Sequence, residues 1–206
     1  MRQTRSLIIR SEDHLNDRLG VIFLVGPDEI GDIAIERLGE YFGRGVHIIK
    51  AVVARDRVEV EVEASWFPEE SNRLVEAAVR LRERKLYRSA QSLLKEAIEL
   101  DPLNANALFE SGLILAHSGT HSEALAMFVR ARETGPENAA MFNAMGAACI
   151  KQERASAAIG YLRRALELEP KNFMARRMLG GLGHKPPAAE RPKPDKSDRA
   201  AKTKSK

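Results

Sequence analysis

The pattern of hydrophobic and polar residues changes near residue 70. Beyond that point, apolar residues recur every three or four positions, as they do on one face of a helix, and the pattern repeats. Three segments of 34 residues, 71–104, 105–138 and 139–172, each close on a proline followed two residues later by an asparagine. These pairs are Pro102 and Asn104, Pro136 and Asn138, and Pro170 and Asn172. A repeat of this length predicts pairs of antiparallel helices stacked into a solenoid.

Individual columns of the repeat support this prediction. When each segment is numbered from 1, position 8 is small, positions 20 and 27 are alanine, and positions 4 and 24 are large and apolar. Small residues allow two helices to cross closely, and large residues fill the space beside the crossing. In repeat order, these residues are Ala78, Gly112 and Gly146 at position 8; Ala90, Ala124 and Ala158 at 20; Leu94, Phe128 and Leu162 at 24; Ala97, Ala131 and Ala165 at 27; and Leu74, Leu108 and Phe142 at 4.

We expect the first helix of each repeat to cover roughly positions 1–14 and the second roughly positions 18–31. The predicted helices are 72–84 and 88–100, 106–118 and 122–134, and 140–152 and 156–169. Residues 173–183 begin a fourth repeat, with Leu179 and Gly180 at positions 7 and 8, and then stop. A half-repeat of this kind predicts a cap over the open end of the solenoid.

These columns resemble the tetratricopeptide repeat (TPR), and the resemblance covers residues 71–172. Two columns depart from the family pattern: position 4 has no tryptophan, and position 11, often tyrosine in the family, holds Leu81, Leu115 and Cys149. Both departures conserve apolar packing. The resemblance implies that position 11 packs between helices, so we expect Cys149 to be a buried apolar residue rather than a reactive thiol.

Residues 1–66 do not follow the repeat, and no family pattern is recognised in them. Apolar runs predict strands at 5–10, 20–25, 46–53 and 57–64, the last with valines alternating with glutamates. Pro27, followed by acidic residues, predicts the start of a helix between the second and third strands. The predicted fold class is therefore α+β: a small β-β-α-β-β domain followed by an all-α TPR solenoid of three repeats plus a capping helix.

A domain of about 65 residues is marginally stable alone, so we expect it to dock onto the repeats or onto another chain. Trp66, Phe67 and Pro68 mark its junction with the TPR domain, which is predicted to cover 67–183. We expect the two aromatic residues to form a buried anchor for the first TPR helix rather than an exposed binding patch.

The composition of the 206 residues bears mainly on the C-terminal tail. Residues 184–206 contain eight Lys or Arg and three Asp or Glu, a net charge of +5, whereas the whole chain carries +4. Because this tail lacks large apolar residues, we expect it to be disordered and solubilising, with weak nucleic-acid or acidic-surface contact as the alternative. The longest apolar run, 21–25, is too short to span a membrane, and no secretory signal is evident. We therefore expect a cytoplasmic protein.

No motif predicts an enzyme, a cofactor or a metal. Residues 26–31, GPDEIG, lie between a predicted strand and a predicted helix, but Asp32 and Ile33 replace the Lys and Ser or Thr of a phosphate-binding P-loop. His117 and His121 have the spacing of helical zinc ligands, yet they straddle Gly119 at a predicted turn. We expect both features to be structural.

The TPR resemblance implies a concave groove lined mainly by the first helix of each repeat. Carried over by repeat position, it selects an apolar strip flanked by asparagines that could hydrogen-bond the backbone of a ligand. The predicted groove residues are Asn72, Val75, Val79, Asn106, Phe109, Leu113, Asn143, Ala147, Ile150, Met174 and Met178.

A charged groove of the kind found in some TPR proteins is not expected. In Hsp70 and Hsp90 co-chaperones, Lys, Arg and Asn clamp the C-terminal carboxylate of the ligand. The resemblance places those clamp positions at Val75, Val79, Glu110, Ala140 and Ala144 in this sequence. Capture of an acidic C-terminal tail is therefore not predicted.

The leading hypothesis is a protein-interaction adaptor or chaperone-like scaffold that holds an apolar peptide or amphipathic helix of a partner in the groove. Type III secretion chaperones for translocator proteins are similar in size and repeat number. One alternative is that the N-terminal domain, the cap or a second copy of the chain fills the groove. Another is that the N-terminal domain senses a ligand or nucleic acid while the repeats serve as an oligomerisation platform. An enzyme site within residues 1–66 is a third.

Overall fold

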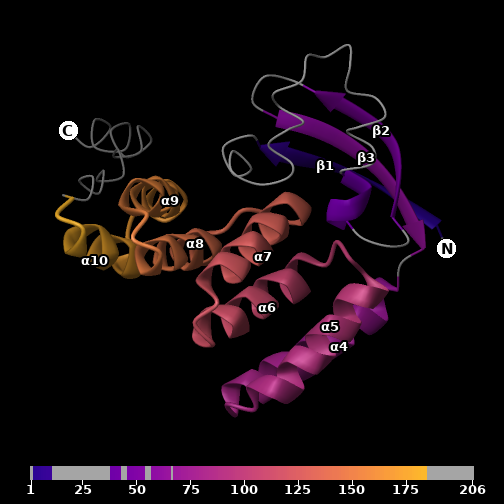
Figure 1. Ribbon diagram of the computed structural model, residues 1–206, viewed down its shortest axis with the longest axis horizontal. Helices are drawn as coiled ribbons and strands as arrows, with labels where there is room; N and C mark the ends of the chain where they lie inside the picture. Colours follow the sequence, from indigo (N-terminus) through magenta and orange to yellow (C-terminus); the bar gives the residue numbers. More distant parts are fainter. Residues whose placement is uncertain (1, 11–37, 43–45, 54–56, 66, 185–206) are drawn as a thin grey trace, which may run out of the picture. The chain divides into compact units, whose positions relative to one another are not determined.

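A computed structural model describes residues 2–10, 38–42, 46–53, 57–65 and 67–184. Its contacts divide the chain into two compact units. The first unit comprises residues 1–137 and 151–153, and the second comprises residues 138–150 and 154–206. Figure 1 shows a small sheet in the first unit, followed along the chain by paired helices. A small sheet followed by a helical array confirms the predicted fold class.

The sheet has three antiparallel strands, β1 (Arg2–Arg10), β2 (Val46–Val53) and β3 (Arg57–Ser65), in the order β1-β3-β2 (Figure 1). Three of the four predicted strands are thus confirmed, and residues 38–42 are helical. The predicted strand 20–25 and the predicted helix start at Pro27 lie outside the described residues. The alternation in β3 behaves as expected, because Val58, Val60 and Val62 are buried whereas Glu59 is exposed.

One residue of the helical array completes the core of this sheet. Leu103 lies in the turn that joins the first repeat to the second, and it is buried at 1% exposure among the apolar residues of the sheet. The other buried members of this core are Leu7, Ile9, Leu38, Phe42, Val46, Val58, Val60 and Val62. The sheet therefore shares its core with the repeats, which confirms the expected docking.

Polar contacts also join the sheet to the repeats, at Asp101, Glu133 and Glu137. The Arg5 guanidinium lies 3.3 Å from the buried Asp101 carboxylate, and Arg10 lies 3.0 Å from Glu137. The hydroxyl of Tyr41 donates a 2.6 Å hydrogen bond to Glu133. These contacts fall at inter-repeat turns and at the end of a second helix, so the described part of the sheet docks beside the repeats.

The first two repeats supply four helices: α4 (Pro68–Glu83), α5 (Tyr87–Leu100), α6 (Ala105–His117) and α7 (His121–Thr134). The first helix begins four residues before the predicted start at 72, because Pro68 fits its first turn together with Glu69 and Glu70. The side chain of Phe67 is 52% exposed, so the prediction of a buried anchor is wrong for this residue. Trp66 lies outside the described residues.

The second unit contains most of the third repeat and the cap: α8 (Ala139–Lys151), α9 (Ala155–Leu168) and α10 (Phe173–Gly181). Phe142 stacks on Tyr161 at a centroid distance of 6.4 Å. Cys149 is buried, as expected, and burial raises the pKa of its thiol although the nearby Arg154 charge opposes the shift.

In the second and third repeats, the close helix crossing favours glycine at repeat position 8. A Cβ atom added to Gly112 would lie 2.5 Å from Cε1 of Phe128, and one added to Gly146 would lie 2.7 Å from Cδ2 of Leu162. In both of these repeats, the partner is the large residue at position 24. The predicted pairing of small and large columns is therefore confirmed at both crossings.

The side chain of the asparagine that closes each repeat accepts hydrogen bonds from backbone N–H groups in the first turn of the next helix. Asn104 Oδ1 accepts from the backbone N–H groups of Asn106 and Ala107, each at 3.1 Å. In the second unit, Asn138 Oδ1 accepts from Met141 at 2.8 Å, and Asn172 Oδ1 accepts from Ala175 at 2.9 Å. This satisfies N–H groups that a helix start would otherwise leave without partners.

Candidate functional site

A hollow of about 460 Å³ lies on the first unit and is lined by residues of α4 and α6, the first helices of the first two repeats. Its lining residues are Val75, Glu76, Val79, Arg80, Glu83, Asn106, Phe109 and Glu110. Four of them, Val75, Val79, Asn106 and Phe109, belong to the predicted groove.

The floor of the hollow is apolar. Val75 is 7% exposed and is part of the core of the first repeat, whereas Val79 and Phe109 are half-buried. The ring of Phe109 packs against Phe128 at a centroid distance of 5.6 Å, which holds it in place. An apolar, concave and partly exposed surface is the usual form of a binding site for a side chain.

An ion pair crosses from α4 to α6 beside the hollow. Nε of Arg82 donates a 2.6 Å hydrogen bond to Oε2 of Glu110, whose side chain is 13% exposed. Sequence reasoning did not predict this pairing. The available signal was opposite charge at position 12 of one repeat and position 6 of the next, because these positions face each other when adjacent first helices align.

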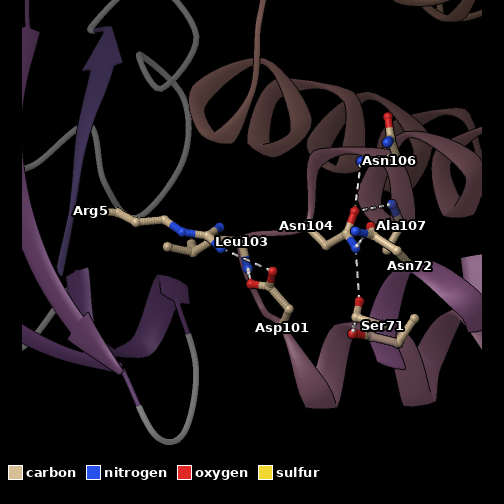
Figure 2. Close-up of polar contacts among 9 residues, drawn as sticks. Arg5, Ser71, Asn72, Asp101, Leu103, Asn104, Asn106 and Ala107 are labelled. Atoms are coloured by element: carbon tan, nitrogen blue, oxygen red, sulfur yellow. Dashed lines mark hydrogen bonds and ion pairs between the residues drawn. The ribbon is translucent and has the colours of Figure 1, made fainter. Parts of the chain in front are cut away.

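The flanking asparagines are less free than predicted (Figure 2). Nδ2 of Asn104 donates to Oγ of Ser71 at 2.8 Å and to Oδ1 of Asn72 at 2.9 Å. Ser71 in turn donates to the carbonyl of Ala97 at 2.8 Å. The side-chain oxygen of Asn72 is therefore occupied, and Asn106, which is exposed and lines the hollow, is the asparagine best placed to meet a ligand.

The remaining predicted groove residues are not lining residues of this hollow. Leu113 is half-buried on α6. Asn143, Ala147, Ile150, Met174 and Met178 belong to the second unit. There, Asn143 donates to Asn172 at 3.1 Å, and Met174 is 56% exposed. Whether these residues bind a ligand stays a prediction.

A second hollow, of about 340 Å³, lies on the sheet and is lined by all three strands. Its lining residues are Ser6, Leu7, Ile8, Lys50, Val52, Glu59, Val60 and Glu61. Ile8 and Val52 are 43% and 47% exposed. The sheet thus also has an apolar surface, which sequence reasoning missed because alternation was considered only for β3.

The two histidines of the predicted turn lie on different helices. His117 ends α6 and His121 begins α7, and the His117 ring packs on Tyr87 at 4.1 Å. Among the residues that the structure describes, no group of three His, Cys, Asp or Glu could hold a metal ion, and no helix could cross a membrane. Residues 26–31 lie outside the described part of the chain.

Comparison with known proteins supports the repeat assignment. Residues 74–139 and 121–173 match the family model of the tetratricopeptide repeat. Among curated proteins, no sequence matches the chain.

Solved structures share the fold of the helical part. YrrB, a TPR protein with an unusual peptide-binding site, is 29% identical with a TM-score of 0.51, and the match covers 53% of this chain and 56% of YrrB. The match therefore spans little more than half of YrrB. The first TPR of Spaghetti (RPAP3), bound to an HSP90 peptide, is 19% identical with a TM-score of 0.56, covering 58% of this chain and 94% of that domain. The Arabidopsis OM64 TPR domain is 23% identical with a TM-score of 0.54, covering 56% and 95%. At these identities, the last two show the fold alone.

Proposed function

Since residues 74–173 form a tetratricopeptide-repeat segment, we propose that the chain is a protein-interaction adaptor whose hollow between α4 and α6 binds a segment of a partner protein. The observation that supports this proposal is the apolar floor of Val75, Val79 and Phe109 inside a concave surface. YrrB, which is 29% identical to this chain over the matched part, has a peptide-binding site. A chaperone-like role, in which the hollow protects an apolar segment of the partner, fits the same surface.

A peptide-display library panned against the full chain tests this proposal. Enriched peptides should share a large apolar residue, and Phe109→Ala should weaken their binding at least about tenfold, since a buried aromatic contact is worth more than 1 kcal/mol. Leu86→Ala is the matched control, because Leu86 is 45% exposed but does not line the hollow. Circular dichroism of each variant checks the fold, and Val79→Ala provides a second groove variant if Phe109→Ala is unstable. Enrichment without any effect of either groove variant would contradict the proposal.

The second candidate function is ligand binding on the sheet. It rests on the hollow between Ile8, Val52 and Glu59, where apolar side chains are exposed. Peptides that lose affinity on Val52→Ser but not on Phe109→Ala would favour this site.

A further inference from the structure

Acidic side chains line the hollow between α4 and α6 together with its apolar residues. Its lining contains three glutamates and one arginine. Glu110 is already paired with Arg82 at 2.6 Å, whereas Glu76 and Arg80 lie 4.0 Å apart and are 72% and 67% exposed. Glu83 has no ion-pair partner among the residues that the structure describes. The rim is therefore negative, and Glu83 is its least neutralised charge.

Glu83 also occupies an unfavourable place in its helix. It is the last residue of α4, where the negative end of the helix dipole disfavours an acidic side chain. The first helices of the second and third repeats, α6 and α8, end instead on His117 and Lys151. Basic side chains are favourable at the C-terminal end of a helix. Local helix stability does not explain Glu83, whereas a position on the rim of a binding surface does.

On the basis of the proposed function, we infer that the occupant is a segment of a partner protein that combines a large apolar side chain with neighbouring Lys or Arg. The apolar side chain packs on Val79 and Phe109, and the cation lies beside Glu83. A C-terminal carboxylate ligand is disfavoured, because the same rim would repel it. The chain's own residues 185–206 are basic but contain no large apolar residue, so they lack the anchor.

Four labelled peptides and fluorescence anisotropy on the full chain test the inference. Three of the peptides have ten residues, with two central leucines and four identical residues on each side: lysine, glutamine or glutamate. The fourth is the peptide of residues 185–206. The lysine peptide should bind at least about threefold more tightly than the glutamine peptide, since an exposed charge pair contributes up to about 1 kcal/mol. The glutamate peptide should bind at least about tenfold more weakly than the lysine peptide, and the 185–206 peptide should not bind.

Variants of the chain identify the charge involved. Glu83→Gln should reduce the preference for lysine over glutamine, and added salt should reduce it in the parent chain. Glu96→Gln, which alters an exposed glutamate on α5, should leave the preference unchanged. Equal binding of the three leucine peptides, or an unchanged preference in Glu83→Gln, would overturn the inference while leaving the proposed function intact. Tight binding of the 185–206 peptide would refute the need for an apolar anchor. Failure of every peptide, together with an unenriched library, would refute the proposed function itself.

Discussion

Replacing Asn104, at the junction of the first two repeats, should destabilise the chain more than replacing Asn138, its equivalent in the second repeat. In Figure 2, this side chain accepts two backbone bonds at the start of α6 and donates to Ser71 and Asn72 on α4. Loss of an N-cap to alanine costs about 1 kcal/mol, and each further intramolecular hydrogen bond contributes about 0.5–1.5 kcal/mol. Asn104 is only 6% exposed, so water cannot readily replace these bonds. We expect Asn104→Ala to lower the free energy of unfolding by about 2–4 kcal/mol.

Asn138→Ala is the matched control, because Asn138 is exposed and caps with one bond of 2.8 Å. Its cost should be about 1 kcal/mol or less. Asn104→Asp separates the two roles, since it keeps the accepting oxygens for the cap but removes the amide donor, and it should fall between the two alanine variants. Urea unfolding followed by circular dichroism gives the free energies. Hydrogen exchange of the Asn106 and Ala107 amides should accelerate selectively in Asn104→Ala. Equal costs for Asn104→Ala and Asn138→Ala would refute the reasoning.

Three further variants or probes test the packing. Gly112→Ala should lower the free energy of unfolding in urea by about 1–3 kcal/mol, because the added Cβ would lie 2.5 Å from Phe128. Combining it with Phe128→Leu should be less destabilising than the sum of the two single changes. Strict additivity would contradict this packing. Leu103→Ala should cost about 2–5 kcal/mol and should increase amide exchange in the sheet as well as at the α5–α6 turn, and an effect on the turn alone would contradict the shared core. Cys149, whose pKa is raised by burial, should stay protonated and react slowly with iodoacetamide at pH 8 in the folded chain but rapidly in urea; equal rates would contradict its burial.

The sequence predicts the helical part well because its information there is periodic. Columns of small and large residues indicated which helices cross, and Gly112 with Phe128 shows that contact directly. The start of α4 was missed because the repeat was counted from residue 71, whereas Pro68 and the acids after it extend the helix beyond the repeat. Helix ends depend on local capping, which a column count does not include.

The candidate site is only partly predictable from repeat positions. They identified the apolar floor, since burial follows helical periodicity. They did not identify the pairing of Arg82 with Glu110 or the bond from Asn104 to Asn72, because both depend on how two helices from different repeats align. Likewise, the burial of Leu103 under the sheet depends on a contact between segments far apart in the sequence. These contacts leave no periodic signal.

Chemical-shift mapping tests the central claim most directly. The lysine peptide is titrated into ¹⁵N-labelled full chain, and the backbone amide shifts are followed. The account predicts that the largest changes lie at residues 75–83 and 106–110, which line the hollow between α4 and α6. Changes confined to residues 6–8, 50–52 and 59–61 would place the ligand on the sheet instead and would contradict the account.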